Sequence, residues 1–249
     1  MEARAALAEL LLSVADDEFV IGFWDSEWTG VAPMLEEDVA TSSIAQDEIG
    51  HAKVLYELLA ELTDDDADRI AFGRTSDAFR HAALMNHARG GWAFSVARRY
   101  LYETADQVRL AALAGSTYEP LALLAGKMRR EETYHLMHAD TWLRRLADGG
   151  NDGRDRLSSA LECLWPDAQG VFAPLNGEET LVREGILPEP MRDMSITWQS
   201  RVRPKLEPIC GALPAAAPSN DGRVRRTSDF TWLHGEFTSV AGSDESATW

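Results

Sequence analysis

Cysteine and long apolar runs are scarce in this sequence. Its 249 residues include two cysteines, Cys163 and Cys210, which excludes a disulfide framework and fits a reducing compartment. No run approaches the roughly 18 apolar residues of a membrane helix, because Glu9 and Asp16 interrupt the apolar stretch around Leu10. No signal peptide is evident. We therefore expect a cytoplasmic protein that does not associate with membranes.

Basic residues are also few. The chain has 24 lysines and arginines against 41 aspartates and glutamates, a formal net charge of −17. A surface of this sign repels a phosphate backbone, which argues against a nucleic-acid partner. We find no glycine-rich phosphate loop after a predicted strand, so we expect no flavin or nicotinamide site in this chain.

Two short motifs stand out among the residues that are present. The strings QDEIGH, ending at His51, and REETYH, ending at His135, each place a glutamate and a histidine three residues apart in a helical pattern. Residues i and i+3 point to the same side of a helix. Glu48 with His51, and Glu132 with His135, can therefore each offer an oxygen and a nitrogen to one ion. Di-iron and di-manganese bundles combine two such pairs with a lone glutamate from each of two further helices.

Two other glutamates meet that requirement. Glu18 and Glu103 each fall where an apolar residue belongs in a stripe with steps of three and four. One Glu-x-x-His pair alone is a weak signal, and a lone glutamate is more often solvated at the edge of a stripe. Four carboxylates buried together without cations would be costly, however, and two divalent ions remove that cost. The stripes are Leu7, Leu11, Val14, Glu18, Ile21; Ile44, Glu48, His51, Leu55, Leu58, Leu62; Trp92, Val96, Tyr100, Glu103, Gln107, Leu110; and Leu121, Ala125, Met128, Glu132, His135, Ala139, Trp142.

The spacing of these glutamates repeats along the chain. The interval from Glu18 to Glu48 and the interval from Glu103 to Glu132 differ by a single residue. The sequence therefore predicts two copies of one helical hairpin, in which Glu103 and Glu132 of the second copy correspond to Glu18 and Glu48 of the first.

Ligand chemistry predicts the metal and its supporting residues. Carboxylate and imidazole ligands without cysteine favour iron or manganese over a structural zinc, and we expect two iron ions, with manganese as the alternative. Asp47 and Glu131 precede the paired glutamates and are placed to accept a hydrogen bond across the helix pair. Asp47 would orient His135 and Glu131 would orient His51; the alternative is that both carboxylates are merely solvated. A third imidazole ligand from His138 is conceivable, although a packed or solvated histidine is the commoner case.

These patterns predict an all-α fold, a four-helix bundle with additional C-terminal helices in one domain over residues 1–249. The metal-binding bundle would occupy about 2–148, and accessory helices about 151–249. We expect bundle helices at about 2–23, after Pro33 to about 62, at about 88–114, and after Pro120 to about 148. In the last third, a helix near 156–165 would break at Pro166, a second would lie between 189 and 210, and 212–222 reads as a linker before an aromatic-rich terminal helix.

On these residues the chain resembles the ferritin-like subunits of the bacterial phenylacetyl-CoA epoxidases, especially the smaller C-type subunit. The resemblance covers nearly the whole length. It rests on Glu18, Trp28, Ala32 and Pro33 with QDEIGH in the first hairpin, on REETYH in the second, and on TWLHGEFTSV at 231–240 with the closing ATW. The implied fold is a ferritin-like bundle.

The match to that family is not uniform. In the epoxidases the longer A-type subunit is catalytic and has an aspartate where this chain has Glu103, whereas many C-type subunits have lost the metal ligands and are structural. This chain combines C-type length and tail with the complete ligand pattern Glu18, Glu48, His51, Glu103, Glu132 and His135.

The resemblance implies a subunit of a multicomponent di-iron monooxygenase that epoxidises the aromatic ring of phenylacetyl-CoA in aerobic phenylacetate degradation. The implied partners are a homologous ferritin-like A-type subunit, a flavin and iron–sulfur reductase, and the aromatic acyl-CoA. Arg98, Arg99, Arg129 and Arg130 are candidates on paper for binding the CoA phosphates; the alternative is that they are solvated or pair with the abundant acids. Two alternatives remain, namely a metal-free structural subunit of the same complex and an independent ferritin-like oxidase or peroxidase.

Overall fold

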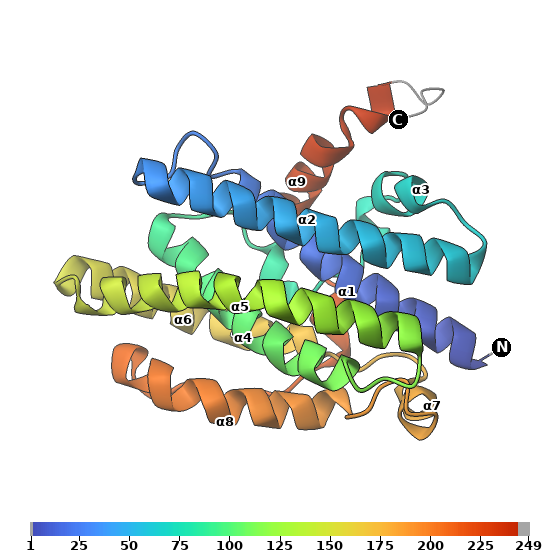
Figure 1. Ribbon diagram of the computed structural model, residues 1–249. Coiled ribbons are helices and arrows are strands. Elements are labelled where there is room, and N and C mark those ends of the chain that lie inside the picture. Colours follow the sequence, from blue (N-terminus) through green and yellow to red (C-terminus); the bar gives the residue numbers. More distant parts are fainter. Residues whose placement is uncertain (1, 244–249) are drawn as a thin grey trace.

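The bundle predicted from the sequence is present in the computed structural model, which describes residues 2–243. Four long helices run side by side (Figure 1): α1 (Glu2–Ser26), α2 (Leu35–Thr63), α4 (Trp92–Leu113) and α5 (Glu119–Asp148). The described residues form α-helices and short 3-10 turns without any strand. The fold is therefore all-α and ferritin-like, as the sequence predicts.

The long helices pair as two hairpins. α1 packs chiefly on α2, and α4 packs chiefly on α5, which is the arrangement that the repeated glutamate spacing predicts. Asp64 ends α2 in the left-handed conformation, with φ 60°, and its N–H bonds back to the carbonyl of Ala60. Pro120 lies in the first turn of α5, where a helix needs no N–H donor.

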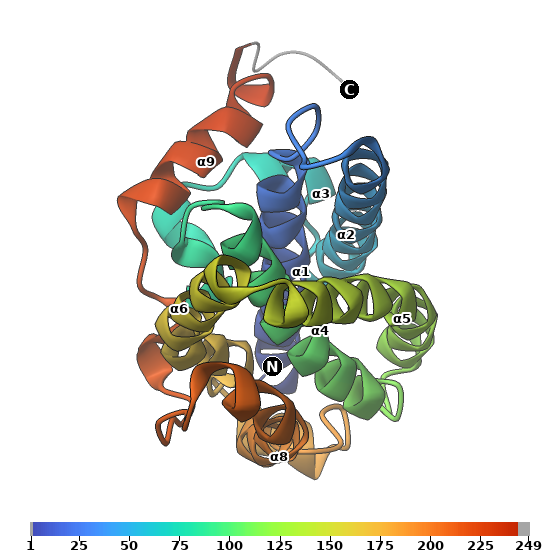
Figure 2. The same ribbon diagram turned by 90° about the vertical axis from the view of Figure 1, so that its left-hand side faces the viewer.

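The last third of the chain packs against these hairpins. It contains α6 (Asn151–Ala168), α7 (Glu178–Arg183), α8 (Met191–Cys210) and α9 (Ser228–Thr238). α6 and α8 contact α4 and each other, and α8 lies on the side of the α4–α5 hairpin opposite to α2 (Figures 1 and 2). α9 contacts α1 and buries Phe230, Leu233 and Phe237, so most of its aromatic residues pack on the bundle.

Some predicted boundaries are wrong. The break at Pro166 is absent, because α6 continues through this residue to Ala168; a proline in the last turn removes one hydrogen bond without ending the helix. The third bundle helix begins at Trp92 rather than near residue 88. The short helix α3 (Ala67–Phe72) was not predicted.

The 3-10 turns of the described residues are η1 (Ser76–Ala78), η2 (Ala83–Asn86), η3 (Gln169–Phe172), η4 (Asn220–Arg223) and η5 (Ala241–Ser243). The closing ATW lies outside the described residues.

Helix α1 lies near the middle of the molecule (Figure 2). Its residues 13–22 are all buried, and they include three consecutive acidic residues, Asp16, Asp17 and Glu18. Burial of three adjacent carboxylates requires cations or hydrogen-bond donors around each of them.

None of the helices within residues 2–243 combines the length and the apolar character that a membrane-spanning segment needs.

Candidate metal centre

The structure brings together the six residues predicted to be ligands. They form two groups of four, in each of which one ligand atom per residue lies within 4.8 Å of the others. The groups share two glutamates, Glu48 and Glu132, and all six side chains are buried. One group is Glu18, Glu48, His51 and Glu132, and the other is Glu48, Glu103, Glu132 and His135.

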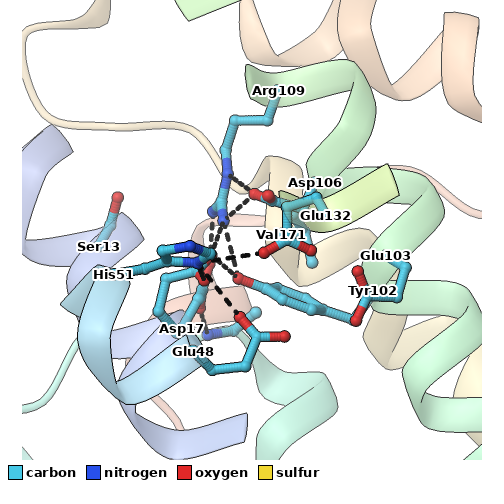
Figure 3. Close-up of polar contacts among 12 residues, drawn as sticks. Ser13, Asp17, Glu48, His51, Tyr102, Glu103, Asp106, Arg109, Glu132 and Val171 are labelled. Atoms are coloured by element: carbon cyan, nitrogen blue, oxygen red, sulfur yellow. Dashed lines mark hydrogen bonds and ion pairs between the residues drawn. The ribbon is translucent and has the colours of Figure 1, made fainter. Parts of the chain in front are cut away.

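Each of the four long helices contributes to this cluster. Glu18 comes from α1 and Glu103 from α4, and the paired motifs come from α2 and α5. Because each ligand replaces an apolar residue on the inward stripe of its helix, packing of the stripes carries the polar groups to one point. Figure 3 shows Glu48 and His51 from α2, Glu103 from α4 and Glu132 from α5 turned toward one another.

The two histidines have matching surroundings. Nδ1 of His51 lies 3.3 Å from Oε2 of Glu18, and its Nε2 lies 2.8 Å from Oε2 of Glu131. Nδ1 of His135 lies 3.4 Å from Oε1 of Glu48, and its Nε2 lies 3.3 Å from Oδ2 of Asp47. With the ring proton on Nε2, each histidine donates to the outer carboxylate and directs the lone pair of Nδ1 at the cluster.

The cluster has the unsatisfied polar atoms that a metal would use. Among residues 2–243, the buried atoms without a hydrogen-bond partner include both carboxylate oxygens of Glu132, Oε2 of Glu48 and Glu103, and Nδ1 of His135. Oxygens Oε1 and Oε2 of Glu132 lie 3.2 and 3.3 Å from Nδ1 of His51 and His135, but without hydrogen-bond geometry. Unpartnered buried carboxylates are rare unless they bind a cation. Four carboxylates and two imidazoles form a donor set that fits iron or manganese.

Electrostatics in the protein without metal explain how so many acids share one site. Burial and the neighbouring carboxylates, Glu132 foremost, raise the pKa of Glu48 and of Glu103 well above the usual range. Burial opposes protonation of His51 and His135, yet contact with Glu132 and the other acids raises the pKa of both imidazoles. The cluster therefore takes up protons when no metal is bound, and metal ions compete with those protons.

The sequence as a whole matches one protein family. The sequence model described as Phenylacetic acid catabolic protein matches residues 1–249. The chain belongs to this family.

Two relatives of this chain are subunits of one enzyme. The chain is 29% identical over 197 residues to the C subunit of 1,2-phenylacetyl-CoA epoxidase from Escherichia coli strain K12, a match that covers 79% of each chain. It is 26% identical over 174 residues to the A subunit of the same epoxidase, a match that covers 69% of this chain and 55% of the relative. The chain thus resembles two different subunits of an epoxidase.

The other predicted residues differ in their relation to the cluster. Asp47 and Glu131 contact His135 and His51, as described above. His138 lies outside both ligand groups and bonds through Nε2 to Glu37 at 2.6 Å. Arg98 is fully buried and donates to the carbonyl of His87, so it is not available on the surface for a CoA phosphate.

Three residues were not predicted to lie at the cluster, and one of them, Arg99, was instead a candidate for the CoA phosphates. Arg99 is buried and donates through Nη1 to Glu48, at 2.8 Å, and to Glu103. Tyr102 donates to Glu18. Arg109 donates to Tyr102 at 3.1 Å (Figure 3). Arg99 falls three residues after Val96 and four before Glu103, so its place on the inward stripe of α4 was a usable signal.

Proposed function

We propose that this chain is a subunit of a multicomponent di-iron monooxygenase that epoxidises the aromatic ring of phenylacetyl-CoA. The observation that carries the proposal is the pair of ligand groups that share Glu48 and Glu132, because shared carboxylates are what hold two ions close together in di-iron bundles. The names of the relatives, the C and A subunits of 1,2-phenylacetyl-CoA epoxidase, support phenylacetyl-CoA as the substrate of the complex.

The chain's own residues would hold the ions. Glu18 and His51 would bind one ion, Glu103 and His135 the other, and Glu48 and Glu132 would bind both. When bound, a pair of ferrous ions supplies electrons that activate dioxygen, so that one oxygen atom enters the ring and the second leaves as water. A separate flavin and iron–sulfur reductase would renew those electrons, since this chain has no flavin motif of its own.

A small cavity beside the cluster supports a role with a small reactant. It has a volume of about 20 Å³ and is lined by residues that include Trp28, Trp92, Arg99 and His138. That is room for about one water-sized molecule, so the cavity would admit only a small reactant such as dioxygen. An aromatic ring needs more space, and the larger pocket beside the cluster, of about 340 Å³ and lined by residues that include His135, is open to solvent. We therefore propose that the A-type partner subunit helps to form the pocket for the acyl-CoA.

A second candidate role is that of a structural subunit of the same complex, with no turnover of its own. The buried Arg99 favours it, because this guanidinium supplies positive charge to Glu48 and Glu103 without any metal. The match over 79% of both this chain and the epoxidase's C subunit points the same way. In this role the chain would bind its partner while another subunit does the chemistry.

Metal content tests the ligand assignment. We expect about two irons per chain after anaerobic ferrous reconstitution of the wild type, measured by elemental analysis. The double variant Glu48→Gln with Glu132→Gln removes both shared ligands with little change in volume, and it should lose both irons. Glu57→Gln, at an exposed position of the same helix as Glu48, should keep both. A wild-type chain that binds no iron would refute the proposed centre.

Oxygen consumption then separates the roles. If this chain is catalytic, oxygen uptake by the complete complex should depend on phenylacetyl-CoA, on the reductase and on Glu48 and Glu132. If the double variant supports the wild-type rate in complex with its partner, the structural role is correct. Ferrous oxidation or peroxide consumption by the chain alone, without any CoA ester, would instead indicate an independent ferritin-like oxidase or peroxidase.

A further inference from the structure

Arg99 is a protein cation placed among the candidate metal ligands. Its side chain is 6% exposed, and its ion-pair partners among residues 2–243 are Asp25, Glu48 and Glu103. Nη1 contacts Glu48 and Glu103 together, and Nη2 contacts Asp25. One guanidinium therefore joins two candidate ligands to a carboxylate that belongs to neither ligand group.

The contacts of Arg99 fall on one of the two ion positions more than on the other. Glu103 belongs only to the group that contains His135, and Glu48 belongs to both groups. Glu18 and His51, which belong only to the first group, are not among the ion-pair partners of Arg99 within the described residues. An ion bound by Glu103 and His135 would therefore have to share its carboxylates with a guanidinium at hydrogen-bond distance.

Charge balance indicates where Arg99 goes when both ions are bound. The four candidate glutamates carry four negative charges, which two divalent ions neutralise fully. Arg99 then has no remaining partner in the cluster and is repelled by the second ion, whereas Asp25 offers a buried carboxylate of its own. Asp25 and Arg99 both line the cavity of about 20 Å³, so there is free space beside the guanidinium on that side.

We propose that Arg99 is a built-in competitor for the second metal ion, and that it withdraws to Asp25 when that ion binds. The ions then bind in order. The position formed by Glu18, Glu48, His51 and Glu132 fills first, and the position formed by Glu48, Glu103, Glu132 and His135 fills second and more weakly. This inference rests on the proposed two-metal centre and names a device that regulates its loading.

Stepwise titration of the metal-free full-length chain with Mn²⁺ under anaerobic conditions tests the order. Electron paramagnetic resonance reports free Mn²⁺ and distinguishes a single bound ion from a coupled pair, so no enzymatic activity is needed. For the wild type we expect two dissociation constants that differ by at least tenfold. Arg99→Gln removes the competing charge and should reduce that ratio by at least tenfold, chiefly by tightening the second step.

Two further variants keep the inference testable if Arg99→Gln folds poorly without metal. Asp25→Asn removes the alternative partner of Arg99, so the second Mn²⁺ should bind at least tenfold more weakly than in the wild type, with the first step changed by less than threefold. Arg99→Lys keeps the charge and should keep the wild-type order.

The outcomes separate this inference from the proposed function. Two Mn²⁺ bound with the same ratio of constants in the wild type and Arg99→Gln would overturn the role of Arg99 and leave the two-metal centre intact. Loss of the second ion in Arg99→Gln would also overturn it, because Arg99 would then be a support of that position. Absence of Mn²⁺ binding in the wild type and in all variants would overturn both. One ion in the wild type and two in Arg99→Gln would support the inference in its strongest form.

Discussion

Asp47 and Glu131 are the carboxylates that contact the outer nitrogens of the two candidate histidine ligands. Each is a partly exposed carboxylate, with side chains 50% and 42% exposed, that contacts the Nε2 atom of a candidate ligand from the other hairpin. Such a partner fixes the tautomer of the imidazole and its orientation toward the metal. We expect Asp47→Ala and Glu131→Ala each to weaken metal affinity about 10- to 100-fold, measured by Mn²⁺ titration of the metal-free chain.

The matched control is Glu57→Gln, which changes an exposed carboxylate on α2 that pairs with Lys53 on the surface. Its Mn²⁺ affinity should equal that of the wild type. If Asp47→Ala and Glu131→Ala also bind Mn²⁺ with wild-type affinity, both carboxylates are merely solvated and the histidines hold their orientation by packing alone.

At the scale of single residues, the sequence predicted the residues that helical spacing places on one inward face. Glu48, His51, Glu132 and His135 were found because the same Glu-x-x-His spacing occurs twice on inward helix stripes, and Glu18 and Glu103 because they interrupt apolar stripes. The place of Arg99 in the cluster was not predicted because a helical arginine is usually solvated, and its burial depends on Asp25, which lies far from it in the chain, near the end of α1. The contact of Tyr102 with Glu18 depends likewise on the packing of α4 against α1, which no local pattern encodes.

At the scale of elements, the two hairpins were predictable, and so was the irregular stretch at 212–219, but the tertiary contacts at the end of that stretch were not. Periodicity indicates long amphipathic helices directly, whereas 212–222 was predicted to be a linker from its prolines and small residues. In the structure that segment runs into η4, whose last residue, Arg223, is buried. Arg223 donates to both oxygens of Asp17, at 2.9 and 2.8 Å, and to the carbonyls of Arg80 and Val171. Segments distant in sequence meet at this one side chain.

Arg223 should therefore contribute strongly to stability. It and Arg109 hold the pKa of the buried Asp17 below its usual value, against the effect of burial. Removing one cation leaves a buried carboxylate that shares Arg109 with Asp106. We expect Arg223→Met to lower the free energy of unfolding by about 3–5 kcal/mol, measured by urea denaturation of the metal-free chain.

Arg225→Met provides the comparison within the same segment. Its guanidinium is 59% exposed and pairs with Asp167, so the same substitution should cost less than about 1 kcal/mol. Equal losses for the two variants would mean that the segment is held by its backbone and apolar contacts rather than by the ion pair between Arg223 and Asp17.

At the scale of the whole molecule, net charge was a poor guide to where the acids lie. The formal charge of −17 predicts an acidic surface, yet Asp16, Asp17, Asp25 and Asp106 are buried along with the four candidate glutamate ligands. Each of those four aspartates contacts a buried or half-buried arginine. Composition gives the sum of charges but not their pairing, and the order in which α6, α8 and α9 pack on the bundle is equally a matter of tertiary contacts.

One titratable group outside the cluster should link the stability of the whole fold to pH. His81 is fully buried between the bundle and α9, with its ring 4.1 Å from that of Phe230 and its Nε2 3.0 Å from Oδ1 of Asn86. Burial and the nearby Arg226 lower the pKa of His81 well below the ordinary value of 6.5. At a pH below 6.5, the unfolded chain binds a proton at His81 that the folded chain does not bind. Its contribution to stability is therefore fully present above pH 6.5 and declines as the pH falls.

The expected size of this effect is up to about 1.4 kcal/mol per pH unit below the unfolded pKa. Urea unfolding of the metal-free chain between about pH 5 and 7.5 should give a shallower slope for His81→Gln than for the wild type, because other groups titrate equally in both proteins. Phe230→Leu weakens the same contact without removing a titrating group, so it should lower the curve by a constant amount and keep the wild-type slope. Parallel curves for the wild type and His81→Gln would mean that His81 binds its proton equally in the folded and unfolded chains.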